Sequence, residues 1–351
     1  MRHTTKLAAV TVAVALVLTG CAKNEGTGAS GSDELCADKE GAGPKIGLAY
    51  DIGGRGDHSF NDLAAAGVKK SLDELDATCE ESEAAQQEPD SAKEERLRTL
   101  AEAGYNPVMA IGYVYSEEVN KVSKEYPNVK FAVVDGFAEG ANVTNLVFAA
   151  EQGAFLVGVA AGLKTKTKKV GFIGGVPGPV IDPFAAGYKA GVAAVDPSIK
   201  VEMKWLSDQA NDQAFANPPG AKTAGTALYD AGNDIVFHAS GLSGNGLFDV
   251  VATQPEGIWA IGVDSDQYQT ASAEQQKHIL TSSLKRVDVA VFDFVKLFKD
   301  GQVKPGFDLY DIKRDGVGYA TSGGFVDDIA GQIDEYKAKL ISGELKAPSK
   351  L

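Results

Sequence analysis

The sequence is poor in the residues that metal sites and nucleophilic active sites need. Its 351 residues include three cysteines and four histidines, and the histidines are scattered: His3, His58, His238 and His278. A zinc or manganese site needs several histidines and carboxylates that converge, and the spacing gives no such set. The segment from Gly241 to Gly244 lacks the second spacer of a G-x-S-x-G elbow. We therefore expect no metal, no cofactor and no catalysis.

Positive charge is also scarce. The chain has 34 Lys and Arg against 48 Asp and Glu, a net charge of −14. A groove for nucleic acid needs clustered basic residues. The one short basic run, Lys164 to Lys169, is most simply a solvated helix end and turn. DNA and RNA polymers are therefore not expected partners.

Apolar residues concentrate at the start of the chain, from Leu7 to Leu18, but this run is too short for a usual membrane span. With Arg2 and Lys6 before it, the run indicates a secretory signal peptide over residues 1–20. "LTGC" at its end resembles the lipobox of bacterial lipoproteins, which predicts acylation of Cys21, palmitate included, and a lipid anchor on the extracytoplasmic face of the cell membrane. The alternative is an ordinary signal peptide with an accidental cysteine.

Residues 21–43 read as a flexible tether, because Ala22 to Asp33 are rich in glycine, serine and charge. Two cysteines remain once Cys21 is assigned to lipid. In an exported, oxidising environment this even pair, Cys36 and Cys79, favours one disulfide. Two unpaired structural thiols are the alternative.

From Pro44 onward, short apolar runs alternate with helical stretches, which predicts an α/β fold with parallel sheets. "KIGLAYDIGG" at Lys45 and "KVGFIGG" at Lys169 begin alike, so two similar lobes are implied. We place the N-terminal lobe at residues 44–148 plus about 268–303, and the C-terminal lobe at residues 149–267 plus about 304–345. In such sheets the ligand lies outside the carboxyl ends of the strands.

The glycine turn after the first strand, Gly54-x-Gly56-x-x-Ser59, comes close to the fingerprint of dinucleotide sites. However, Asp57 occupies the place of the anion, and Asp51 and Asp62 add negative charge that opposes a pyrophosphate. We interpret Asp57 as a helix N-cap. The loop is expected to hold a base or sugar edge and no phosphate.

Four segments in order, "DIGGRGDHSFND", "ASGLSGNGLFD", "GVDSDQY" and "LTSSLKRVDVAVFD", lie behind the lipobox. Together they resemble the basic membrane protein family, substrate-binding lipoproteins of ABC transporters that include purine nucleoside receptors. The resemblance implies a two-lobed type I periplasmic-binding fold with three crossovers, a nucleoside between the lobes and ABC permease subunits as partners. We expect a monomer.

The resemblance also implies roles for single residues. Phe60 would stack on the purine, Asn61 and Asp135 would bond its edge, and Phe215 would stack on the opposite face. Without the resemblance, Phe60 could instead be a hydrophobic staple at a helix start.

The resemblance also matches a ligand-binding glycine to Gly241 or Gly244, and for the ribose it implies contacts from Asp264 and Lys285. Taken alone, Asp264 could form a turn and Lys285 could be a surface lysine. A sugar receptor of the same fold, a ligand sensor that reports to a membrane partner and an exported nucleoside hydrolase remain alternatives.

Overall fold

The computed structural model describes Met1, residues 35–37 and residues 40–351. The predicted signal peptide, Cys21 and most of the predicted tether lie outside these residues. In the described part of the chain, no helix is long and apolar enough to cross a membrane.

The first sheet contains six strands in the order β11-β5-β4-β3-β1-β2, and its neighbouring strands pair in parallel. Its central strands are apolar and buried on both faces, as parallel strands between helices are. The strands are β1 (Lys45–Ala49), β2 (Thr78–Ser82), β3 (Val108–Ile111), β4 (Phe131–Val134), β5 (Val143–Phe148) and β11 (Gly306–Tyr310).

The second sheet repeats this order as β12-β10-β9-β8-β6-β7, and only β12 pairs antiparallel. Each strand thus has a counterpart in the first sheet, β1 with β6 and β4 with β9. The duplication expected from the two similar strand starts is present in the topology. The strands are β6 (Lys169–Gly174), β7 (Lys200–Trp205), β8 (Ile235–Ala239), β9 (Trp259–Asp264), β10 (Ile279–Lys285) and β12 (Val317–Tyr319).

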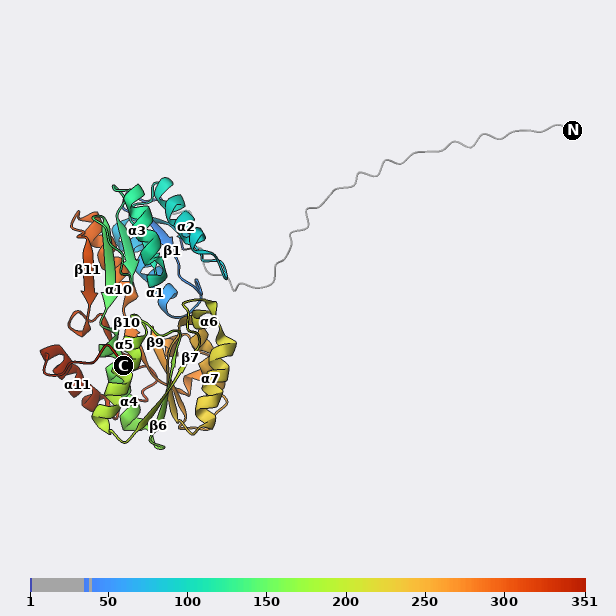
Figure 1. Ribbon diagram of the computed structural model, residues 1–351, viewed down its shortest axis with the longest axis vertical. Coiled ribbons are helices and arrows are strands. Elements are labelled where there is room, and N and C mark those ends of the chain that lie inside the picture. Colours follow the sequence, from blue (N-terminus) through green and yellow to red (C-terminus); the bar gives the residue numbers. More distant parts are fainter. Residues whose placement is uncertain (2–34, 38–39) are drawn as a thin grey trace. The chain divides into compact units, whose positions relative to one another are not determined.

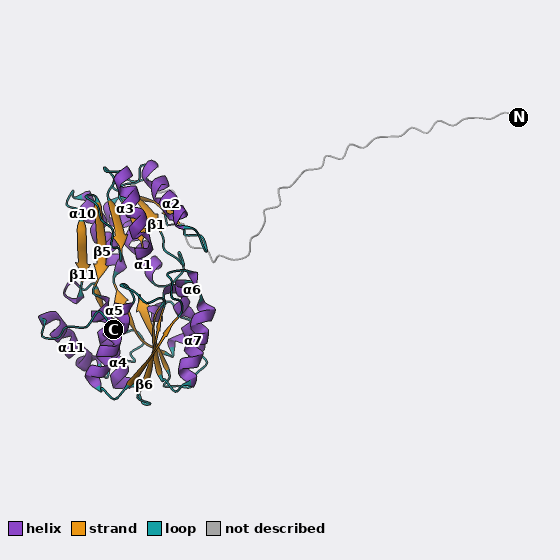
Figure 2. Ribbon diagram, in the orientation of Figure 1, coloured by secondary structure: helices purple, strands orange, loops and turns teal. Residues whose placement is uncertain are grey.

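Helices cover both faces of each sheet (Figures 1 and 2). Around the first sheet, α1 and α10 pack on one face and α2 and α3 on the other. Around the second, α4, α5 and α11 pack on one face and α7 and α8 on the other. These helices are α1 (Phe60–Leu75), α2 (Asp90–Glu102), α3 (Ser116–Glu125), α4 (Ala150–Lys164), α5 (Asp182–Val195), α7 (Pro218–Asp230), α8 (Asn245–Val251), α10 (Val287–Lys299) and α11 (Ala330–Ser342). The two-lobed α/β fold predicted from the sequence is confirmed.

The chain passes between the sheets after β5, after β10 and between β11 and β12. Two strands therefore differ from the expected lobe boundaries. Strand β10, expected in the first lobe, pairs with β9 in the second sheet and covers an edge that β9 would otherwise expose. Strand β11, expected in the second lobe, pairs with β5 along its whole length. Helices α10 and α11 lie with the lobes to which we assigned them.

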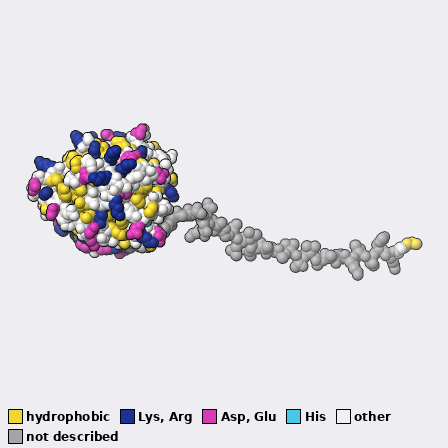
Figure 3. Space-filling view, turned by 90° about the horizontal axis from the view of Figure 1, so that it is seen from below, with side chains coloured by type: hydrophobic (Ala, Val, Ile, Leu, Met, Phe, Trp, Pro, Cys, Tyr) yellow, Lys and Arg dark blue, Asp and Glu magenta, His cyan; other side chains and the backbone are white. Residues whose placement is uncertain are grey.

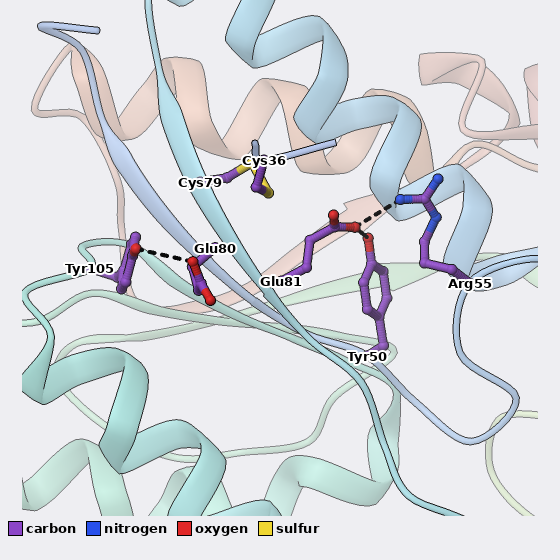
Figure 4. The surroundings of a disulfide bond; sticks show 7 residues. All are labelled: Cys36, Tyr50, Arg55, Cys79, Glu80, Glu81 and Tyr105. Carbon is purple, nitrogen blue, oxygen red and sulfur yellow. Dashed lines mark hydrogen bonds and ion pairs between the residues drawn. A yellow bond between two sulfur atoms is a disulfide. The ribbon is translucent and has the colours of Figure 1, made fainter. Parts of the chain in front are cut away.

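A disulfide joins Cys36 to Cys79, with 5.1 Å between the Cα atoms. Cys79 lies on the edge strand β2, and the bond fastens the segment before Pro44 to the first lobe (Figure 4). The disulfide expected from the even cysteine pair is thus present in the structure.

Candidate functional site

The carboxyl ends of strands from both sheets surround one cavity, in which about 530 Å³ of space, part of it open to solvent, is not filled by atoms. Of the predicted binding residues, the lining includes Phe60, Asn61, Asp135, Phe215, Gly241, Asp264 and Lys285. Gly244 does not line it: a Cβ at this position would meet the ring of buried His238, so close packing is what requires this glycine.

The loop between β1 and α1 is held by Asp57, which is 1% exposed. Its Oδ1 accepts hydrogen bonds from the N–H groups of Ser59 and Asp62, at 2.9 and 3.1 Å. Its Oδ2 accepts from the backbone N–H of Asn61 at 2.8 Å. Ser59 is the N-cap residue by position, but it makes no capping side-chain bond. The Asp57 carboxylate lies two residues before the N-cap. It accepts hydrogen bonds from backbone N–H groups at the start of α1 that have no partner within the helix.

The amide of Asn61 is largely engaged within the same loop. Its Oδ1 accepts from the backbone N–H of Asp51 at 3.0 Å, and its Nδ2 donates to Asp57 at 3.1 Å. Asn61 is 1% exposed. One amide hydrogen and one oxygen lone pair remain for a ligand.

Arg55 fastens the loop to the body of the first lobe. Its guanidinium contacts Asp62 at 3.3 Å and Glu81 at 2.8 Å, and Glu81 also accepts from the hydroxyl of Tyr50 (Figure 4). Its backbone N–H reaches Glu83. These contacts tie the loop before Phe60 to the first lobe independently of any ligand contact.

Two aspartates occupy equivalent places in the two lobes. Asp135 directly follows β4 and Asp264 ends β9, and both have left-handed backbones, with φ of 59° and 61°. Non-glycine residues seldom adopt this conformation. Glycines with positive φ follow another pair of equivalent strands, Gly112 directly after β3 and Gly241 two residues after β8. At all four positions the chain turns sharply where its strand meets the cavity.

Lys285, the last residue of β10, lies between these aspartates and is 3% exposed. Its ammonium bonds directly to Asp135 of the other lobe, and its Nζ lies 4.0 Å from Oδ1 of Asp264. Its Nζ is also 4.8, 5.3 and 5.6 Å from the ring centroids of Phe60, Phe148 and Phe184.

Further contacts join the lobes beside the cavity. The hydroxyl of Ser59 donates to Oδ2 of Asp264 at 2.7 Å. The hydroxyl of Ser265 donates to the carbonyl of His58 at 2.6 Å. The cavity is therefore enclosed by direct bonds between the two lobes.

Negative charge in this cavity is poorly solvated. Burial raises the pKa of Asp57 to about 7 and that of Asp51 to about 7, and neighbouring carboxylates add to both effects. Burial also raises the pKa of Asp264, against the opposing effects of Lys285 and Ser59. A phosphate would add further negative charge to a site in which burial already disfavours ionised carboxylates. Among the described residues, no group of three or more His, Cys, Asp or Glu side chains could hold a metal ion.

The model of a family described as "ABC transporter substrate-binding protein PnrA-like" matches residues 44–350. The chain belongs to this family. Relatives include the "CD4+ T-cell-stimulating antigen" of Listeria innocua, 33% identical over 97% of this chain and 96% of that protein, and the "Basic membrane protein A" of Borreliella burgdorferi, 30% identical over 87% and 88%. The resemblance drawn from the four sequence segments is therefore confirmed.

Another relative, the "ABC transporter nucleoside-binding protein BmpA" of Lactococcus lactis, is 29% identical over 98% of each chain. Among solved structures, an ABC transporter solute-binding protein of Aeropyrum pernix is 25% identical, with a TM-score of 0.75 over 87% of this chain and 94% of that one. The Lac repressor, 13% identical with a TM-score of 0.54 over 80% and 81%, shares the fold. This family member is thus an ABC transporter substrate-binding protein.

Several cavity residues were not predicted from the sequence, notably Asp51, Tyr113 and Phe184. Phe184 lies in the first turn of α5, much as Phe60 opens α1. Since α1 and α5 follow the equivalent strands β1 and β6, the internal duplication would have predicted Phe184. Tyr113, directly after the positive-φ Gly112, has no comparable signal in the sequence.

Proposed function

We propose that this protein binds a purine nucleoside between its two lobes and delivers it to the permease of an ABC importer. The lipid on Cys21 would hold it at the extracytoplasmic face of the membrane, and no reaction would be catalysed. The proposal goes beyond the family's general role in naming the ligand, the anchor and the delivery step.

The observation that carries the proposal is the pairing of aromatic rings with carboxylates in one cavity. Phe60 comes from the first lobe, and Phe184 and Phe215 from the second. Broad aromatic faces suit a base, since stacking contributes about 1–3 kcal/mol per base. Asp264 suits vicinal hydroxyls, because an ionised carboxylate accepts strong hydrogen bonds.

The charge of the cavity favours a nucleoside over a nucleotide. Four aspartates, Asp51, Asp57, Asp135 and Asp264, face it, and among its described lining residues Lys285 alone is basic. A phosphate group would find no counter-charge, because Lys285 is already bonded to Asp135. The name of the Lactococcus lactis relative supports the same ligand class.

The proposal is tested by purifying the protein without denaturation and identifying any small molecule released from it by mass spectrometry. We expect a purine nucleoside in stoichiometric or partial occupancy. A hexose or pentose in its place would support the sugar receptor. Steady conversion of an added nucleoside to base and ribose would support the hydrolase.

A further inference from the structure

We propose that the site takes purine nucleosides whose base carries a positive charge, such as bases methylated at a ring nitrogen, and binds them more tightly than neutral nucleosides of the same shape. This inference rests on the proposed function, because it requires the base to lie among the phenylalanine rings.

The first observation is the position of the Lys285 ammonium. Three ring centroids, those of Phe60, Phe148 and Phe184, lie within 5.6 Å of its Nζ. A cation within about 6 Å of a ring centroid is attracted by the negative face of the ring. Lys285 is almost fully buried, so these rings surround a positive charge away from water. Phe60 and Phe148 come from the first lobe and Phe184 from the second.

The second observation is the excess of carboxylates. Lys285 balances one of the four aspartates by bonding to Asp135. Asp57 is compensated in part by the N–H donors at the start of α1. Asp264 receives the Ser59 hydroxyl, with the ammonium 4.0 Å away. Asp51 accepts one bond, from the N–H of Ile52. Burial raises the pKa of Asp51 and of Asp57 to about 7, so a cation bound beside these side chains favours their ionised forms and is neutralised by them.

The shape of a methylated base suits these phenylalanine rings. A base methylated at a ring nitrogen spreads its positive charge over a flat aromatic system, which can stack on the same phenylalanine faces that a neutral base would use. Its attraction to the rings then adds to ordinary stacking. Burial strengthens the attraction to the carboxylates, because the effective dielectric constant falls. Methylation removes one acceptor of the base edge, but the neutral comparison ligand lacks the same acceptor. The carboxylates and ring faces must outweigh the repulsion from the Lys285 ammonium, which lies near the same rings.

The test compares two ligands of one shape. 7-Methylguanosine carries a positive charge, and 7-methyl-7-deazaguanosine has a carbon in place of the charged nitrogen and is neutral. Calorimetry at pH 6 should give a dissociation constant about tenfold lower for the cation, as expected for cation–π and charge attraction in a desolvated site. Equal affinities, or tighter binding of the neutral ligand, would overturn the inference.

Two variants change the charge of the site in opposite directions. Asp135→Asn removes the carboxylate that bonds to the Lys285 ammonium. The ratio of the affinity for the charged ligand to that for the neutral ligand should therefore fall toward one. Lys285→Met removes the ammonium already present in the site. The same affinity ratio should therefore rise above that of the unaltered protein. The readout is the ratio of the two affinities, since either substitution weakens both ligands. A ratio that moves in the same direction in both variants contradicts the assignment.

Guanosine separates this inference from the function on which it rests. If guanosine binds and the two methylated ligands bind equally, only the preference for charge is wrong. If guanosine binds and neither methylated ligand does, the site excludes the methyl group and the inference is also wrong. If no nucleoside binds, the proposed function fails and the inference fails with it.

Discussion

At the scale of single residues, two aspartates of the site adopt a backbone conformation that is uncommon for residues other than glycine. Asp135 and Asp264 occupy equivalent strand ends, and both are left-handed. Such conformations cost roughly 1–3 kcal/mol each and persist where the surroundings fix them, often at binding sites. Here the fixing groups are Lys285 for Asp135 and Ser59 for Asp264, each from the opposite lobe.

Phe60 and Asp264 should contribute to affinity by different physics. Phe60→Ala removes a stacking face and should weaken ribonucleosides and 2′,3′-dideoxynucleosides alike, by about 1–3 kcal/mol. Asp264→Ala removes an acceptor for ribose hydroxyls and should weaken ribonucleosides more, by about 1.5–3 kcal/mol. Calorimetry with inosine and 2′,3′-dideoxyinosine makes the comparison. An equal loss for both ligands in Asp264→Ala would remove that residue from the ribose contacts.

His238 should stay neutral in the folded protein at any mild pH. It is fully buried beside Gln267, and burial lowers its pKa to about 4. The unfolded chain binds a proton near pH 6.5, so folding loses stability as pH falls from 6.5 toward 4, by up to about 3 kcal/mol. NMR of the imidazole should show no titration above pH 5. A midpoint near 6.5 would mean that water reaches the ring.

At the scale of elements, most strands could be predicted from short apolar runs, but the polar edge strand β2 could not. The runs "KIGLAY", "KFAVVDG" and "WAIGVD" became β1, β4 and β9, because their apolar side chains are buried between helices. Strand β2, "TCEES", contains no apolar run that would predict it. It lies at a sheet edge, carries Glu80 and Glu81, and is held by pairing with β1 and by the disulfide.

The sequence predicts those site residues that lie at the carboxyl ends of strands. Lys285 reaches the cavity although β10 was assigned to the wrong lobe, because the strands of both sheets direct their carboxyl ends at the cleft. The partner of Lys285 could not be derived in this way. Its bond to Asp135 joins residues 150 positions apart, and it depends on how the two lobes meet.

The contribution of the disulfide to the free energy of unfolding can be estimated from the length of chain that it closes. It closes a segment with a sequence separation of 43, for which loop-closure entropy predicts about 4 kcal/mol of stabilisation. Replacing both cysteines with serine should lower the free energy of unfolding by up to this amount in urea titrations. Ligand affinity should change less than about twofold, since Cys79 does not line the cavity. Unchanged stability would show that the bond does not constrain the unfolded chain.

At the scale of the whole molecule, the proposed function requires both a membrane anchor and two lobes that meet over a ligand. The face in Figure 3 carries both basic and acidic side chains. The lipid on Cys21 is proposed as the attachment to the membrane. Cys21→Ala should release protein into the soluble fraction with unaltered nucleoside affinity, as cell fractionation and calorimetry would show. Protein that stays in the membrane fraction would contradict this.

The most direct measurement of the central claim is calorimetric titration of the purified, ligand-stripped protein with guanosine, inosine, free ribose and glucose. If a base lies among the phenylalanine rings and a ribose beside Asp264, both nucleosides bind and the two free sugars bind at least a hundredfold more weakly, because they lack the stacking contribution of about 1–3 kcal/mol and the contacts of the base edge. Tight binding of ribose or glucose, with no heat from any nucleoside, would contradict the account.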